Sequence, residues 1–368
     1  MTLSYGRLGL ALTLLTACPA DDDGTGTGTT SGTSSGSATD PTTTTEDPTT
    51  APGSSEGSTT TTAADTTTGD TTTADTTGTT GDTDTAGFDC TTVPAGPFAA
   101  ERILMDVPFQ TFAEGGAEDL GFDGQGHIAA RGQGNAYLLV SADGTFEEFA
   151  NDSDDTYGLR FLANGDVVAA AYQAGEILRV TPDGNVSTFA DGVGGVNGLF
   201  PDSMGGVWYT NFAEVGYITA DGNDISVISP ASAANGIFFD EARQIVFFTN
   251  YQSGALRKAD LVDGLAQDPV DLGEIPGAPD GITLDICGNL YVNDQGGSDM
   301  YRLLLDDTAM PVGEPELLVE GGFPTNVANA QFGSGDGWEP TSLYAIGGGG
   351  GLYRVDVGVP GAPYVTVE

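Results

Sequence analysis

The fold of this chain is decided by a short phrase that recurs along it. The two clearest copies read NGIFFDEARQIVFFTN at residues 235–250 and DGITLDICGNLYVND at residues 280–294. Each copy holds an apolar segment, a turn with small or polar residues, and a second apolar segment, which is the pattern of a β-hairpin. The phrase therefore predicts a pair of antiparallel strands wherever it occurs.

Six related phrases begin at regular intervals. They open at Glu118, Tyr157, Asn197, Asn235, Asp280 and Asn326, which are 38 to 46 residues apart. A second hairpin pattern follows each phrase, as in YLLVSADGTFEEFA at residues 137–150, where the Asp-Gly pair suits a tight turn. Four-stranded units of this length are typical of propeller blades. We therefore predict an all-β protein, a six-bladed β-propeller with four antiparallel strands in each blade.

A ring of blades needs one strand to complete its last sheet. The segment FQTFA at residues 109–113 resembles the outer-strand segments STFA and EEFA, and the terminal YVTVE from Tyr364 competes for the same place. We expect the N-terminal segment to close the sixth blade.

Composition divides the chain into three parts, at residues 1–17, 18–88 and 89–368. The first part carries the apolar run LGLALTLLTA, which is too short to span a bilayer and has the length of a signal-peptide core. The second is rich in Thr, Ser, Gly and Asp and buries too little apolar surface to fold, so we expect a disordered tether. The third is the predicted propeller.

The segment LTAC, which ends at Cys18, resembles the lipobox of bacterial lipoproteins. That resemblance implies cleavage before Cys18, acylation of its thiol, and a lipid anchor in the bacterial outer membrane or at the cell surface. A plain secretory signal with a chance cysteine is the alternative. Both interpretations place the protein outside the cytoplasm, where a disulfide between Cys90 and Cys287 is predicted, with two free thiols as its alternative.

The formal net charge is −43, from 53 acidic and 10 basic residues. Such a charge excludes nucleic acid and anionic membrane surfaces as partners and favours cations. We expect a monomer that binds a small-molecule substrate or ligand and touches the membrane only through the lipid on Cys18.

The residues that open the six phrases should meet at one mouth of the central channel, because every innermost strand starts there. Glu118, Asn235 and Asp280 then offer two carboxylates and one amide oxygen to a common point. Oxygen ligands of this kind suit Ca²⁺, or Mg²⁺ or Mn²⁺, rather than Zn²⁺. The alternative is that Asn-Gly and Asp-Gly at strand starts are ordinary turn chemistry.

These residues resemble the SMP-30/gluconolactonase family of six-bladed propellers, on Glu118, on NGIFFD at residues 235–240 and on PDGITLDICGNLYVND at residues 279–294. The resemblance implies one divalent cation, commonly calcium, held by Glu118, Asn235 and Asp280. It also implies that Asn197 faces the metal or the substrate, and that the activity is lactone hydrolysis.

We assign Asp280 as the catalytic residue, which ligates the ion and takes a proton from water. Asn197, Tyr157 and Asn326 are predicted to bind substrate. His127, the only histidine, falls in a turn away from the ring, which argues against a Ser-His-Asp site.

Two departures from the family pattern bear on the substrate. Sugar-acid lactonases of the family place an arginine two residues before the third-blade asparagine, where this chain has Gly195, and no basic residue stands close to the ring in sequence. The first copy reads AEDLGFD, without the usual Glu-Gly-Pro. A neutral or apolar lactone, or another ester, is therefore favoured.

The sequence thus predicts a metal-dependent hydrolase of the lactonase type. The alternatives are a non-catalytic propeller that binds a ligand or a protein, and a structural envelope protein.

Overall fold

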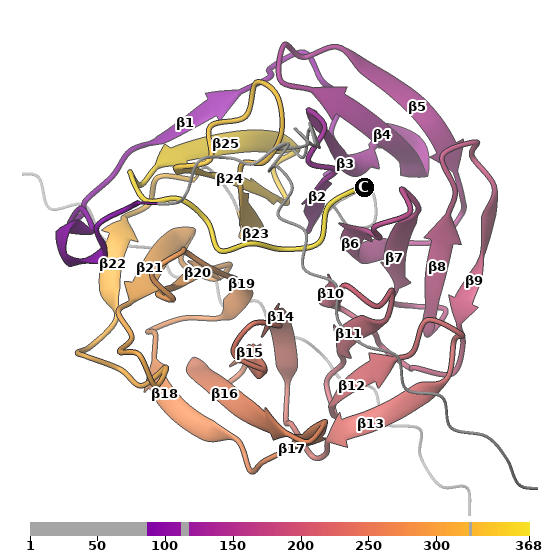
Figure 1. Cartoon of the computed structure of the whole chain (residues 1–368). Helices are drawn as coiled ribbons and strands as arrows, with labels where there is room; N and C mark the ends of the chain where they lie inside the picture. Colours follow the sequence, from indigo (N-terminus) through magenta and orange to yellow (C-terminus); the bar gives the residue numbers. More distant parts are fainter. Residues whose placement is uncertain (1–86, 112–117, 324–325) are drawn as a thin grey trace, which may run out of the picture. The chain divides into compact units, whose positions relative to one another are not determined.

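The computed structural model describes residues 87–111, 118–323 and 326–368. Within these ranges the chain forms six sheets of antiparallel strands placed around one axis, with β2, β6, β10, β14, β19 and β23 innermost (Figure 1). The prediction of an all-β, six-bladed propeller is confirmed. No helix in the described ranges is long and apolar enough to cross a membrane.

The first three blades follow the chain from the axis outward. Their strands are β2 (Leu120–Phe122), β3 (His127–Gly132), β4 (Ala136–Ser141), β5 (Phe146–Asn151), β6 (Thr156–Phe161), β7 (Val167–Ala171), β8 (Glu176–Val180), β9 (Val186–Ala190), β10 (Leu199–Pro201), β11 (Val207–Thr210), β12 (Val215–Ile218) and β13 (Asp224–Ile228).

The last three blades repeat this order, with one additional short strand, β17, in the fourth. Their strands are β14 (Ala234–Asp240), β15 (Ile245–Asn250), β16 (Ala255–Val262), β17 (Leu265–Ala266), β18 (Val270–Glu274), β19 (Pro279–Leu284), β20 (Leu290–Asp294), β21 (Asp299–Leu303), β22 (Glu316–Val319), β23 (Val327–Phe332), β24 (Ser342–Gly347), β25 (Gly351–Asp356) and β1 (Ala100–Ile103).

The sixth blade is closed by β1, which pairs with β25 so that Ala100 lies opposite Val355. An N-terminal strand therefore closes the ring, as expected, but the prediction that this strand is residues 109–113 was wrong. Phe109 instead forms a bridge with Gly132 of blade one, and residues 112–113 lie outside the described ranges. The error has a physical reason: an outermost strand is half exposed, so the AERI sequence of β1 needs no apolar alternation.

The C-terminal strap, residues 361–368, crosses the mouth opposite the strand starts (Figure 1). Ala362 N donates to Leu284 O at 3.0 Å, Tyr364 Oη to Phe332 O at 2.9 Å, and Val367 N to Asp123 O at 2.9 Å. These acceptors lie at the ends of inner strands in blades five, six and one, or just beyond them. The strap therefore closes the channel at this end and forms no part of a blade.

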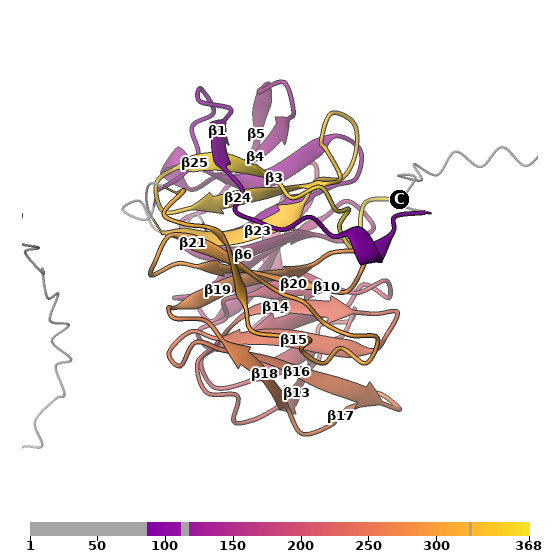
Figure 2. The same ribbon diagram turned by 90° about the vertical axis from the view of Figure 1, so that its left-hand side faces the viewer.

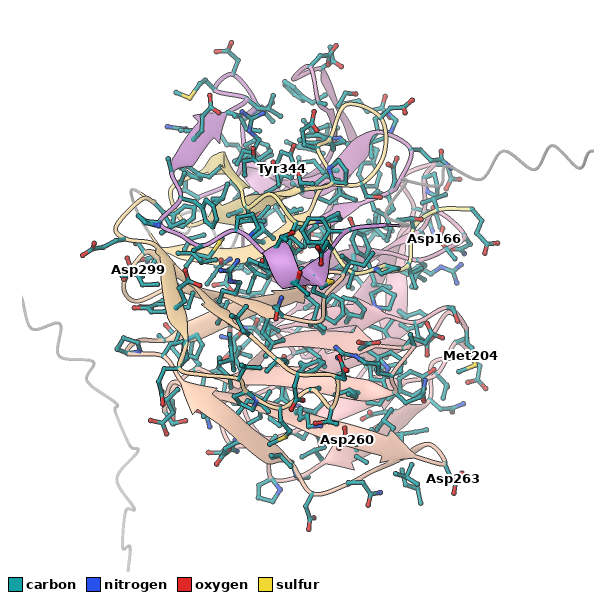
Figure 3. All side chains as sticks on the ribbon, turned by 60° about the vertical axis from the view of Figure 1, so that its left-hand side comes forward. Asp166, Met204, Asp260, Asp263, Asp299 and Tyr344 are labelled. Atoms are coloured by element: carbon teal, nitrogen blue, oxygen red, sulfur yellow. A yellow bond between two sulfur atoms is a disulfide. The ribbon has the colours of Figure 1, made fainter. Side chains whose placement is uncertain are left out.

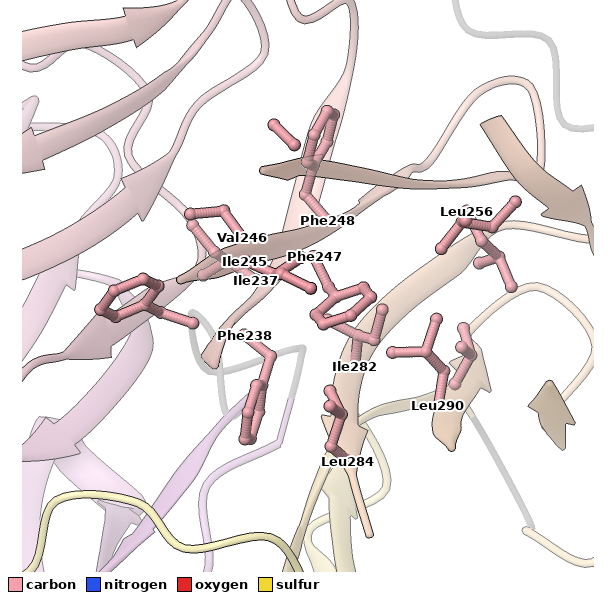
Figure 4. Close-up of a cluster of buried hydrophobic side chains, with 14 of the residues drawn as sticks. Ile237, Phe238, Ile245, Val246, Phe247, Phe248, Leu256, Ile282, Leu284 and Leu290 are labelled. Atoms are coloured by element: carbon pink, nitrogen blue, oxygen red, sulfur yellow. The ribbon is translucent and has the colours of Figure 1, made fainter. Parts of the chain in front are cut away.

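Apolar side chains of adjacent blades pack face to face. Figure 4 shows Phe238 and Phe247 of blade four near Ile282 and Leu290 of blade five, all within one buried cluster. Both tryptophans lie between blades: Trp208 contacts Phe239 with ring centroids 5.0 Å apart, and Trp338 contacts Phe122 with centroids 5.3 Å apart. The acidic residues lie mainly outside this core, as Asp260, Asp263 and Asp299 illustrate at the outer margin (Figure 3).

A disulfide joins Cys90 to Cys287. Cys90 opens the short 3₁₀ turn η1 (Cys90–Thr92), and Cys287 lies in the turn between β19 and β20 of blade five. Figure 2 shows η1 on the same face as the C terminus. The bond therefore fastens the segment that leads to β1 onto the propeller.

Candidate functional site

The starts of the inner strands converge on one small cavity at the upper mouth of the channel. Five of the six residues that open the sequence repeats line it: Glu118, Tyr157, Asn197, Asn235 and Asp280. The cavity measures about 10 Å³, which is close to the volume of a single water-sized sphere. It is therefore the size of one water molecule or one ion.

Asn326, the sixth predicted member, does not line this cavity. It is exposed, and its carbonyl oxygen accepts a hydrogen bond from Gly348 N at 3.0 Å. Asn329 lines the cavity from the position that a glycine holds in blades two to five, since it stands three residues before Phe332 as Gly158 stands three residues before Phe161. Alignment on the apolar strand, rather than on the first asparagine, would have shown this shift.

Three carboxyl groups line the cavity: Asp119, which is paired with Arg160, and Glu118 and Asp280. Glu118 is 7% exposed and Asp280 is 4% exposed. Burial raises the pKa of Glu118 to about 8, although hydrogen bonds with Gln295 and Asn197 oppose the rise. Burial and then the charge of Glu118 raise the pKa of Asp280 well above its ordinary value. Without a cation, burial therefore favours the protonated form of both groups relative to an exposed carboxyl.

Gln295 is the functional residue that the sequence analysis missed. Its Nε2 donates to Asp280 Oδ2 at 2.8 Å, and its Oε1 accepts from Tyr251 Oη at 2.7 Å. Because Gln295 also hydrogen-bonds to Glu118, it connects the two carboxyl groups. Its only sequence signal is its place directly after the second strand of blade five.

Asn235 points to a missing partner at the same cavity. It is 5% exposed, and among the described residues no donor reaches its Oδ1 atom. A buried carbonyl oxygen without a partner costs about 1–3 kcal/mol. A cation beside Glu118 and Asp280 would satisfy this oxygen as well.

The ligand set fits a hard cation that accepts amide oxygens. Within the described ranges, no three His, Cys, Asp or Glu side chains come together as a metal site. Any cation at the cavity would therefore combine the two carboxylates with amide oxygens such as Asn235 Oδ1. Calcium, with six to eight flexible oxygen ligands, tolerates such a set better than zinc does.

A buried ion pair adjoins the cavity, which one of its members, Asp119, also lines. Asp119 forms a salt bridge with Arg160. It also accepts hydrogen bonds from Leu159 N at 2.9 Å and from Asn329 Nδ2 at 2.8 Å. The expectation that no basic residue stands close to the ring was wrong, since Arg160 follows Tyr157 by three residues. Arg160 is nevertheless committed to Asp119 and to the Leu120 and Leu159 carbonyls, both at 2.7 Å.

Glycine follows the ring residue in blades two to five for reasons of space. A Cβ atom on Gly236 would lie 2.0 Å from Asp280 O, and one on Gly158 would lie 2.3 Å from Asn197 O. The four glycines are Gly158, Gly198, Gly236 and Gly281, and none of them has a positive φ. The turn-chemistry explanation of the Asn-Gly and Asp-Gly pairs is therefore wrong: the glycines let neighbouring inner strands approach around the axis.

Gly236→Ala is expected to destabilise the propeller by about 2–4 kcal/mol, because its Cβ must displace the backbone of Asp280. Urea unfolding with and without calcium would measure this. Gly313→Ala is the matched control, since a Cβ there meets nothing within 4 Å. Equal stability of the two variants would contradict the packing argument.

The Thr-Asn pairs that end the second strands in blades three and four are structural. Thr249 Oγ1 accepts from Gly236 N at 2.8 Å and donates to Asp280 O at 2.9 Å, and so ties blade four to blade five. Asn250 Nδ2 donates to Ser232 O at 2.6 Å, and Asn250 Oδ1 accepts from Ser253 N at 3.0 Å. These bonds fix the loop that follows β15. These residues position the ring and do not line the cavity.

His127 lies apart from this centre, as predicted from its turn position. Its Nδ1 contacts Asp123 Oδ2 at 2.7 Å, in the turn between β2 and β3. It does not line the ring cavity.

Comparisons with known proteins find the same fold. No protein-family model and no curated protein matches the chain. A luciferin-regenerating enzyme structure matches 74% of this chain and 99% of its own, with 18% identity and a TM-score of 0.60. A gluconolactonase from Xanthomonas campestris matches 74% and 94%, with 17% identity and a TM-score of 0.59. The calcium-binding protein regucalcin from Agrobacterium tumefaciens matches 74% and 99%, with 15% identity and a TM-score of 0.58.

At these identities the comparisons show the fold alone. The six-bladed ring is the same in a gluconolactonase, a regucalcin and this chain, while most side chains differ. The chemistry of the site has to be argued from the residues that line the cavity.

Proposed function

We propose that this protein is a divalent-metal-dependent hydrolase of lactones or related esters, with its centre at Glu118, Asn235 and Asp280. The observation that carries the proposal is the meeting of two buried carboxyl groups and the unpartnered Asn235 Oδ1 at one ion-sized cavity. A cation would compensate all three oxygens at once. The similar folds of a gluconolactonase and a calcium-binding regucalcin support the proposal.

Glu118, Asn235 and Asp280 would hold the cation, and when bound it would supply positive charge where negative charge develops on the carbonyl oxygen. Asp280 accepts the proton of the attacking water. The water oxygen bonds to the acyl carbon, the acyl–oxygen bond breaks, and the proton passes to the leaving oxygen. Asn197 and Tyr157 orient the substrate.

We also propose that the enzyme acts outside the cytoplasm as a monomer, tethered by a lipid on Cys18. The signal segment, Cys18 and the tether up to residue 86 lie outside the described residues. The disulfide between Cys90 and Cys287 is consistent with an oxidising compartment.

The proposal is tested by calorimetric titration of the chelator-treated full-length protein with Ca²⁺, Mg²⁺ and Mn²⁺, followed by assays on aryl, alkyl and sugar lactones. We expect one bound ion per chain, and hydrolysis that disappears with chelator and returns with metal. Metal binding without turnover on any lactone would instead indicate a non-catalytic binding propeller. Failure of all three ions to bind would overturn the metal centre itself.

A further inference from the structure

Three consecutive blades bring an aromatic residue to the upper mouth. Tyr172 directly follows β7, Tyr251 directly follows β15, and Phe212 follows β11 after one residue. With Tyr157 of the ring they form what we call the aromatic wall: Tyr157, Tyr172, Phe212 and Tyr251. The proposed hydrolysis does not by itself require these side chains.

The wall is attached to the candidate metal centre at both ends. The rings of Tyr157 and Tyr172 are 5.0 Å apart in a T-shaped contact, and Tyr157 lines the ion-sized cavity. At the other end Tyr251 Oη donates to Gln295, which holds Asp280. The loops that carry Phe212 and Tyr251 are neighbours, because both bond to Ala233. Phe212 O accepts a hydrogen bond from Ala233 N at 2.7 Å, and Ala233 O accepts one from Tyr251 N at 2.9 Å.

The wall is open on the side that faces solvent. Phe212 is 43% exposed, and the three tyrosines are partly exposed. Among the described residues, a Cβ atom added to Gly195 would meet only the Tyr172 ring, at 3.8 Å. Cβ atoms added to Gly192 and Gly194 would meet nothing within 4 Å. The approach to Asn197 is therefore built of small residues that leave room beside the Tyr172 ring.

The charges near the wall are acidic. The carboxyl groups of Glu118 and Asp155 lie close enough to Tyr157 to affect it electrostatically. Those of Asp280, Glu118 and Asp294 do the same at Tyr251. None of the described residues that line the cavity is basic, and Arg160 beside it is bound to Asp119. An anionic substrate would find no basic side chain to pair with among these lining residues, whereas an uncharged ring would find aromatic faces.

We propose that the aromatic wall selects uncharged lactones or esters with an aromatic or apolar ring, which lies against Tyr172 and Phe212 while the carbonyl faces Asp280. This inference rests on the proposed function and adds the substrate class to it. An acyl chain or aryl ring on such a substrate would bury the exposed faces of the wall.

The test compares two lactones with the full-length, calcium-loaded protein. Dihydrocoumarin carries a fused aromatic ring, whereas γ-butyrolactone offers almost no apolar body. Tyr172→Ala and Phe212→Ala should each lower kcat/KM for dihydrocoumarin about 5- to 10-fold more than they lower kcat/KM for γ-butyrolactone. Tyr172→Phe should restore activity. Phe146→Ala, which removes an exposed phenylalanine from the outer strand β5, is the matched control and should change neither rate.

The possible outcomes distinguish a failure of the aromatic-wall proposal from a failure of the hydrolase proposal. Equal loss for both lactones, or no loss for either, would overturn the wall and leave the hydrolase proposal intact. If the wild type hydrolyses neither lactone, the hydrolase proposal fails, and the wall is judged by calorimetric binding of the lactam 3,4-dihydro-2-quinolinone. Binding that Tyr172→Ala weakens about 10-fold would support the wall, whereas no binding to the wild type would overturn it.

Discussion

Asp280→Asn is expected to lower lactone hydrolysis by about 100- to 1000-fold, because it removes the proposed base and one of two carboxylate ligands. The same change should raise the stability of the metal-free protein at a pH high enough to remove the protons from the pair, since a buried carboxylate that repels Glu118 becomes a neutral amide of the same shape. A gain of 1 kcal/mol would raise the melting temperature by about 2–4 °C. Initial rates and calorimetric melting, both on chelator-treated and calcium-loaded protein, measure the two effects.

Asp285→Asn is the matched control for this variant. Asp285 is also buried and also has a raised pKa, caused first by burial, but it bonds to Asn289 and Tyr291 away from the ring. The Asp285→Asn variant should have a lower free energy of unfolding, with calcium binding and turnover unchanged. If Asp280→Asn destabilises the metal-free protein and keeps its turnover, the assignment of Asp280 is wrong.

Calcium should stabilise the protein more strongly as the pH rises from 5 to 9. The pKa of Glu118 is raised from 4.5 to about 8 in the folded state, and that of Asp280 is raised as well. The proton on Glu118 therefore contributes stability that is fully present below about pH 4.5 and is lost as the pH rises through about 8, and the proton on Asp280 acts in the same direction. Metal replaces those protons, and at 1000 times its dissociation constant it adds about 4 kcal/mol.

Melting temperatures recorded across this pH range, with chelator and with calcium, check the prediction. We expect the two curves to diverge above about pH 6. Glu118→Gln should flatten the chelator curve, because it removes the titrating carboxyl. A metal-free protein whose melting temperature climbs between pH 6 and 9 would contradict the account.

Much of the fold was accessible from the sequence because the blades are local structures. Each hairpin pairs residues only a few positions apart, and the alternation of apolar residues marks its strands. The recurrence of the phrase then counts the blades. The same argument placed Glu118, Asn235 and Asp280 together, since every copy of the phrase enters its blade from the same end.

The sequence was less informative where the repeat pattern weakens. Asn326 opens the sixth copy, but Asn329 lines the cavity, because the strand register is set by Phe332 and not by the first polar residue. The closing strand was misplaced for a similar reason. β1 is half exposed, so its sequence carries no strong apolar signal.

By itself the sequence determined the blade number, the strand order within a blade and the residues offered to the ring, all of which follow from short repeats and from alternation. Only the tertiary structure decided how that ring is completed. Gln295 reaches Asp280 and Tyr251, Arg160 neutralises Asp119, and the strap closes the far mouth. These contacts join residues that no local pattern links, because they exist only once six separate hairpins have converged on one axis.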